Sequence, residues 1–194
     1  MLPRSLPFAA CALALALVPD ARASAVLDRP IEEMTARSAL VVRGKVVKTE
    51  ARWDASHRRI QTYTQVRVSE SLKGQAPATV LVRQPGGHVG ELEQLVAGAA
   101  EFAPGEDVVL FLERAPDEAG AHLVAGMSAG AVRLERANTG ELRAVRRLSG
   151  LELVKMRDRG PAEVRVVDRD DLGEADAFLR RVRAAAPKKP EGAP

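Results

Sequence analysis

Residues 59–90 read RIQTYTQVRVSESLKGQAPATVLVRQPGGHVG, and their pattern decides the fold class. Over Arg59–Leu72, β-branched residues alternate with polar ones, which is typical of a strand with one buried face. The pattern then predicts a turn at Lys73-Gly74 and a second strand over Thr79–Gln84. The preceding stretch, Leu40–Trp53, has the same period of two. We therefore expect Leu40–Trp53 and Arg59–Leu72 to form a long antiparallel hairpin.

The segments after this stretch extend the β pattern. Asp107–Glu113 is apolar on both faces, which indicates a central strand, and short strands with turns about every ten residues continue to Leu148. Gly44 lies inside a strand and predicts a bulge or sharp bend. We expect a mainly β protein, with a small antiparallel OB-like barrel over residues 24–148, a short N-terminal helix and a C-terminal helix.

Both helices have recognisable start signals. Asp28 is expected to cap a short helix whose first turn contains Pro30. Residues 149–186 are expected to form a C-terminal extension that ends in a helix over 171–186, capped by Asp171 with Glu174 at the capping-box position. Within the extension, residues 151–156 and 164–167 fit either a strand pair or poorly ordered chain. Residues 187–194 are expected to be a disordered tail.

The first 23 residues have the features of a secretory signal peptide. Arg4 precedes an apolar run over Phe8–Val18, and small residues allow cleavage after Ala23 or, alternatively, after Ala25. No later segment reaches the roughly 20 apolar residues of a membrane-spanning helix. We expect an exported protein, periplasmic or extracellular, with no transmembrane segment in the mature chain.

Cysteine and histidine usage limits the possible chemistry. Cys11 is the only cysteine and lies inside the expected signal peptide, so the mature chain is cysteine-free and has no disulfide, reactive thiol or cysteine metal ligand. His57, His88 and His122 are far apart in sequence and have no metal-ligand spacing. We therefore predict no catalytic residue, no metal site and no cofactor.

The charge distribution gives little support to a nucleic-acid partner. The formal net charge is +3; residues 1–140 hold 16 basic and 16 acidic side chains, and residues 141–194 hold 13 and 10. The excess is a weakly basic C-terminal quarter on a neutral body. Trp53 and Tyr63 are the only Trp and Tyr, so few side chains can stack on bases. We expect no nucleic-acid partner.

One motif imitates a catalytic signature. Residues 126–130, GMSAG, fit the G-x-S-x-G nucleophile elbow of the α/β-hydrolases. The segment that follows is strand-like rather than helical, and all three histidines precede Ser128, whereas the hydrolase order places its histidine after the serine. We interpret the motif as a tight turn.

The end of the deciding stretch, QPGGHVG, and the residues that follow it are not explained by packing. Residues 88–103 are expected to form a long loop, with one helical turn around 91–96, and such loops often carry function. No Lys-Ser/Thr follows the glycines, so we do not expect a phosphate cradle. The candidate binding residues are Trp53, Tyr63, Arg83, Gln84, Gly86, Gly87, His88 and Gly90.

The run from Trp53 to Leu112, W-D…R-R-I-x-T-Y…V-x-V…S-L-K-G…V-x-V-R-Q-P-G-G-x-V-G…F-x-P-G-E-D-V-V-L-F-L, resembles a group of uncharacterised exported bacterial domains. These occur alone or beside matrixin-type metalloproteases. The resemblance covers about residues 26–135 and implies a small β-barrel of OB-like or netrin-like (tissue metalloprotease inhibitor) character. It carries over no catalytic residue. The chain has no H-E-x-x-H motif, and a cysteine-free mature chain cannot form the cysteine-dependent metal clamp of the animal inhibitors.

Three functions remain open. The first is a non-catalytic exported binding module whose partner is another exported protein, for which a protease is conceivable. The alternatives are a small exported hydrolase, whose carboxylates and histidines assemble only in the fold, or a protease-associated, inhibitor-like domain. The sequence leaves the identity of the partner and the oligomeric state open.

Overall fold

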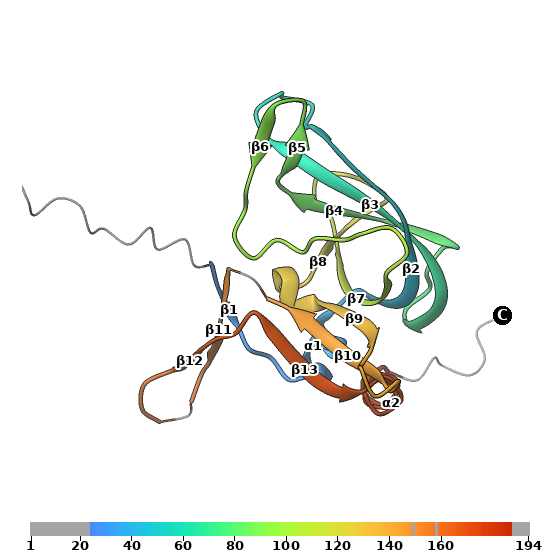
Figure 1. Ribbon diagram of the computed structural model, residues 1–194, viewed down its shortest axis with the longest axis vertical. Coiled ribbons are helices and arrows are strands. Elements are labelled where there is room, and N and C mark those ends of the chain that lie inside the picture. The colour runs from blue at the N-terminus through green and yellow to red at the C-terminus, as the bar shows by residue number, and fades with distance from the viewer. Residues whose placement is uncertain (1–23, 149, 158, 188–194) are drawn as a thin grey trace, which may run out of the picture.

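The computed structural model describes residues 24–148, 150–157 and 159–187, and this part of the chain is mainly β (Figure 1). The expected signal peptide, with Cys11, and all of the expected tail except Pro187 lie outside these ranges. Neither described helix is long and apolar enough to cross a lipid bilayer. The elements in chain order are β1 (Ser24–Leu27), α1 (Ile31–Arg37), β2 (Leu40–Trp53), β3 (Ile60–Lys73), β4 (Thr79–Pro85), β5 (Gly87–Val89), β6 (Leu92–Gln94), β7 (Asp107–Arg114), β8 (Ala121–Val124), the 3₁₀ turn η1 (Met127–Gly130), β9 (Ala131–Arg136), β10 (Leu142–Arg147), β11 (Leu151–Lys155), β12 (Glu163–Val166), β13 (Arg169–Glu174) and α2 (Ala175–Ala185).

The expected long hairpin is confirmed, because β2 and β3 pair antiparallel along their whole length. Around it, β7, β2, β3, β4 and β8 pair in that order, and a further β7–β8 pairing closes them into a ring of five strands. The β4–β8 pair is parallel and the other pairs of the ring are antiparallel. Strands β9, β10 and β13 continue the sheet outward from β7.

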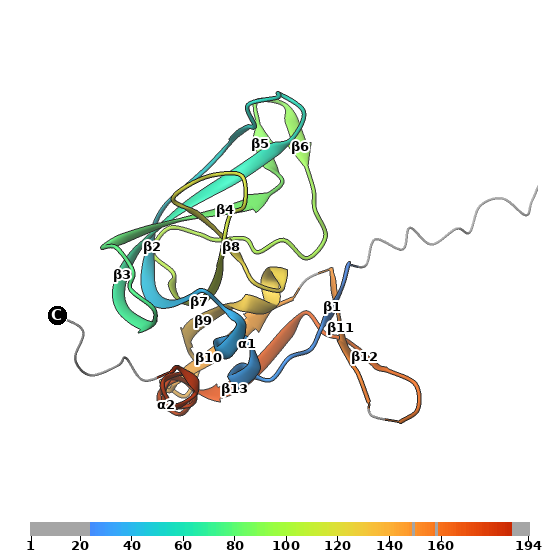
Figure 2. The same ribbon diagram turned by 180° about the vertical axis from the view of Figure 1, so that it is seen from behind.

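Strand β7 contributes to two separate apolar clusters, as its two apolar faces predicted. Val108, Leu110 and Leu112 face the interior of the ring, whereas Val109 and Phe111 face the opposite side. On that opposite side α1 and α2 lie together against the sheet (Figure 2). The C-terminal helix therefore shares a core with the ring strands.

Both helix starts differ from the prediction. Pro30, not Asp28, is the N-cap of α1, and Asp28 instead accepts hydrogen bonds from Arg146 and Arg165. Helix α2 begins at Ala175 rather than at residue 171, and neither N-cap makes a side-chain capping hydrogen bond. Residues 169–174 form β13 because β10 offers them a strand edge, so backbone pairing replaces the expected cap at Asp171.

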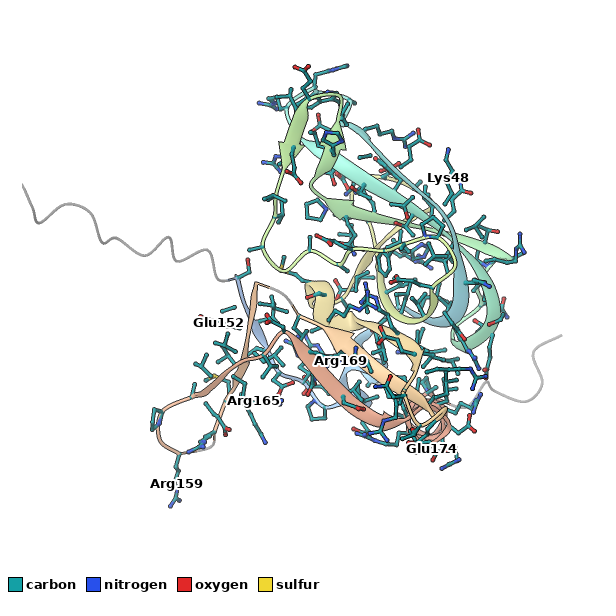
Figure 3. The ribbon with its side chains drawn as sticks, viewed as in Figure 1. Lys48, Glu152, Arg159, Arg165, Arg169 and Glu174 are labelled. Carbon is teal, nitrogen blue, oxygen red and sulfur yellow. The ribbon has the colours of Figure 1, made fainter. Side chains whose placement is uncertain are left out.

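Of the two alternatives for residues 151–156 and 164–167, the structure has the strand pair. Strands β11 and β12 form an antiparallel hairpin, and β1 joins β11 in parallel. This hairpin projects from the body, with Glu152 and Arg165 along it and Arg159 at its far end (Figure 3). Its inner face packs on the body through Leu151 and Leu153.

We expect the protein to lose stability as pH falls below about 4, which unfolding in urea at a series of pH values will measure. Burial raises the pKa of Asp170, but hydrogen bonds and charge from Arg146 and Arg165 outweigh it, so the pKa of Asp170 is lowered overall. A carboxyl group with a lowered folded pKa stabilises the protein above its unfolded pKa of about 3.9, and this contribution is lost as pH falls through the folded pKa. A flat profile down to pH of about 3 would contradict the assignment.

Candidate functional site

The interior of the ring changes from apolar to polar along its strands. Val66 of β3 and Val82 of β4 belong to the interior apolar cluster. Towards one end of the ring, the next inward positions of these antiparallel strands are Thr64 and Thr62 on β3 and Gln84 on β4. Thr62 and Gln84 are direct cross-strand partners. One end of the ring interior is therefore lined by uncharged hydrogen-bonding side chains.

A pocket of about 570 Å³ opens at this polar end, and we call it the loop pocket. Its lining comes from β2, β3 and β4, from the β5–β6 hairpin and from residues 95–102. We call residues 95–103 the strap; in Figure 1 the chain descends from β6 and crosses the molecule towards β7. Ala100 and Phe102 of the strap pack on the interior cluster of the ring. The volume lies within the range of pockets that hold small ligands or inserted side chains.

Gln84 is the most unusual residue of the loop pocket. Only 5% of its surface is exposed, and its Nε2 is buried without a hydrogen-bond partner among the described residues. Its strand neighbours Val80 and Val82 face the same interior and are apolar. A buried amide nitrogen without a partner destabilises the folded state by about 1–3 kcal/mol. The last torsion of a glutamine side chain is soft, so the carboxamide can turn to donate to an occupant of the pocket.

The two glycines after Pro85 let the backbone turn beside the pocket. Gly86 and Gly87 both have positive φ, which glycine adopts readily. A Cβ at Gly87 would lie 2.3 Å from Thr62 Oγ1, so no larger residue fits there. Thr62 Oγ1 in turn donates to the Gly86 carbonyl at 2.7 Å.

Residues 88–103 are more ordered than the expected loop. Residues 87–94 form the β5–β6 hairpin, so the expected helical turn around 91–96 is wrong. Gln94 fixes this hairpin to the ring, because its Oε1 accepts a hydrogen bond from the Ile60 backbone N–H at 3.0 Å.

A buried arginine holds the strap in place. Arg133 of β9 donates to the Glu101 carbonyl and, at 3.2 Å, to Glu106 Oε1, while Glu106 Oε2 accepts from the Ala103 backbone N–H. The guanidinium carbon of Arg133 lies 5.7 Å from the centre of the Phe102 ring. The side chain of Arg133 is 5% exposed, so these contacts are made largely out of water and fix the position of the strap.

The predicted binding residues fall into separate groups. Gln84, Gly87 and His88 line the loop pocket, with Gly86 at the adjacent turn. Tyr63 and Arg83 pair with each other on the outer face of β3 and β4. Successive side chains of a strand point to opposite faces, which is why Arg83 and Gln84 diverge.

Tyr63 and Arg83, the outer-face group, are already engaged by other side chains of the same chain. The Tyr63 hydroxyl donates to Glu118 at 3.0 Å, and the guanidinium carbon of Arg52 lies 3.9 Å from the centre of the Tyr63 ring. Arg83 donates to Asp117 and Glu118 in the β7–β8 connection. The hydrogen bond from Arg83 lowers the pKa of Asp117, so the pair stays charged at neutral pH.

The remaining predicted residues do not join either group. Trp53 stacks near His57 in the β2–β3 connection, at 6.4 Å between ring centres. Gly90 lies between β5 and β6, and no atom lies within 4 Å of the position that a Cβ would occupy there. Neither residue lines the loop pocket.

The groups that an enzyme would need are dispersed over different elements. His88 is exposed on β5, and His122 lies on β8, where burial lowers its pKa. Ser128 is buried in the 3₁₀ turn η1, which leads into β9, so the GMSAG motif forms a turn as predicted. Within the described ranges, no group of three or more His, Cys, Asp or Glu side chains is placed to hold a metal ion.

The chain matches no protein-family model, and no curated protein matches it significantly. The function must therefore be inferred from the geometry of the loop pocket.

Sequence reasoning missed several residues of the pocket. Thr49 lies on β2, where its hydroxyl oxygen is 3.3 Å from that of Thr64 and donates to the Phe102 carbonyl at 3.4 Å. The signal for Thr62 was present, since it occupies an inward position of the alternating stretch in which valines follow. No local signal connects Arg133 to the strap, because the contact joins residues about thirty positions apart.

Proposed function

We propose that this protein is an exported, non-catalytic binding module built on an OB-like barrel, and that its ligand occupies the loop pocket. The observation that carries the proposal is Gln84, whose nearly buried carboxamide lines the pocket with Nε2 unpartnered among the described residues. Binding a ligand that accepts this hydrogen bond would recover the free energy lost by its burial.

The strand arrangement supports an OB-like barrel. An OB-fold is a five-stranded, partly open barrel. Here the consecutive strands β2, β3 and β4 are followed by β7 and β8, which return to complete a ring of five. OB-folds commonly bind ligands on the face of their second and third strands, which correspond to β3 and β4. In this chain Asp117 and Glu118 already engage Tyr63 and Arg83 on the outer face, which favours the loop pocket as the binding site.

Export is the second part of the proposal, and β1 supports one of the two cleavage sites. Strand β1 pairs with β11 over Ser24–Leu27. Cleavage after Ala23 keeps the pairings of Ser24 and Ala25 with β11, whereas cleavage after Ala25 removes them. N-terminal sequencing of the exported protein should therefore begin at Ser24.

The test of binding uses variants of the pocket. The mature protein should co-purify with an exported partner, and Gln84→Leu should raise the Kd for the purified partner about tenfold, since an interface residue of this kind contributes more than 1 kcal/mol. His88→Ala at the rim should weaken binding less. Gln65→Leu, an exposed glutamine on the outer face of β3, is the matched control and should leave the Kd unchanged. If the Gln84→Leu protein binds the partner with the same Kd as the unmodified protein, the loop pocket is not the binding site.

A further inference from the structure

The loop pocket is lined by acidic but not by basic side chains. Among its lining residues the only carboxylates are those of Glu93 and Glu101, and none is a lysine or arginine. Arg133, on β9, lines a second pocket of about 250 Å³ that shares Ala99, Glu101 and Phe102 with the loop pocket, and its guanidinium is engaged by Glu106 and the Glu101 carbonyl. An anionic ligand would meet Glu93 and Glu101 and no lysine or arginine among the lining residues, so the pocket disfavours phosphate, sulfate and carboxylate groups.

The rim of the loop pocket exposes aliphatic side chains. Leu95 lines the pocket and is 71% exposed, and Leu92 on the neighbouring β6 is 59% exposed. Exposed leucines beside a pocket gain free energy when a partner removes them from water. Phe102 is the only aromatic lining residue besides the His88 imidazole, and it packs on the ring interior, so the pocket has no open phenyl or indole platform for a sugar or a base.

Together these features define a class of occupant. We propose that the loop pocket binds an uncharged or cationic polypeptide segment, whose aliphatic side chains cover Leu92 and Leu95 and whose amide oxygen accepts a hydrogen bond from Gln84. The inference rests on the proposed binding function and adds the chemistry of the ligand. The two rim carboxylates supply the charge complementarity, and the Gln84 carboxamide supplies the polar specificity.

The test uses capped tripeptides that differ only in the middle residue: acetyl-Leu-Gln-Leu-amide, acetyl-Leu-Lys-Leu-amide and acetyl-Leu-Glu-Leu-amide. Binding to the isotope-labelled mature protein is followed by NMR titration. We expect the Gln and Lys peptides to shift the amide signals of residues 84–102 and to bind about tenfold more tightly than the Glu peptide. At about 0.5 M salt the Lys and Glu peptides should differ less, because screening weakens exposed charge pairs.

Two variants separate the contributions to binding. Glu93→Gln together with Glu101→Gln should remove most of the discrimination against the Glu peptide, whereas Gln84→Leu should weaken the Gln peptide and Gln65→Leu should not. If the Glu peptide binds as well as the others, or if only a neutral disaccharide such as chitobiose binds, the proposed ligand class is wrong although the pocket still binds. If no probe shifts the signals of residues 84–102, this inference falls, and the co-purification with Gln84→Leu decides the proposed function separately.

Discussion

Replacement of Arg146 by methionine is expected to lower the free energy of unfolding by about 3–5 kcal/mol, because it leaves the largely buried carboxylate of Asp170 without its main partner and removes one of the two arginines that contact Asp28. Arg146 on β10 is 4% exposed and donates to Asp170 of β13 and, at 3.5 Å, to Asp28 before α1. Arg165 of β12 completes the group at 3.3 Å from Asp28 and 3.1 Å from Asp170, but it is half-exposed. The four side chains connect four separate parts of the chain.

Guanidinium unfolding of the mature protein measures this effect. The matched control is Arg181→Met, which removes an ion pair with Glu32 in which both side chains are about half exposed. Such surface pairs contribute at most about 1 kcal/mol. Equal losses in the two variants would show that the buried group has no special role in stability. The Arg146→Met protein should also depend less on pH in acid, because Asp170 loses the main partner that lowers its pKa.

Replacement of Gly44 by alanine is expected to cost about 3 kcal/mol, because the added methyl group meets the backbone of the neighbouring strand. A Cβ at Gly44 would lie 2.3 Å from the Arg67 carbonyl oxygen and 2.8 Å from Val66 Cγ1. The β2–β3 register shifts at this position, as the glycine within the alternating strand predicted. To relieve the clash, β2 and β3 must separate where the ring curves, so the variant should also expose the interior cluster.

Gly90→Ala is the informative comparison for this substitution. Gly90 has a positive φ of 63° but no atom within 4 Å of an added Cβ, so alanine there carries backbone strain alone, of about 1 kcal/mol. Gly44 has the reverse combination, a close contact without a positive φ. Chemical unfolding of both variants separates the two effects. A Gly44→Ala protein as stable as Gly90→Ala would mean that the strands yield easily at the bulge.

The strands were largely predictable because alternation is a local signal that burial enforces. The pattern over Leu40–Trp53 gave the bounds of β2, and the two apolar faces of Asp107–Glu113 predicted the central position of β7. The helix starts were less predictable, because the same short sequence can cap a helix or form a strand. Asp171 satisfies the rules for an N-cap, yet the free edge of β10 pairs with its backbone, and only tertiary structure provides that edge.

The candidate site was also predictable in part from the sequence and in part only from the tertiary structure. Gln84, Gly87 and His88 were proposed from sequence because the QPGGHVG segment had no packing explanation, and they line one pocket. Tyr63 and Arg83 were proposed with them, but the period of two directs these side chains to the outer face, where Glu118 engages both. Proximity along a strand is therefore a poor guide to a shared site.

The sequence by itself determined a mainly β chain, the long hairpin, the bend at Gly44 and the turn glycines, because each depends on the conformational limits of a few neighbouring residues. Only the tertiary structure decided that the strap covers the polar end of the ring and that Arg133 holds it there. It also decided that Gln84 is buried with its Nε2 unpartnered among the described residues. These features depend on contacts between segments that are distant in sequence, and no local pattern records which buried polar group will lack a partner.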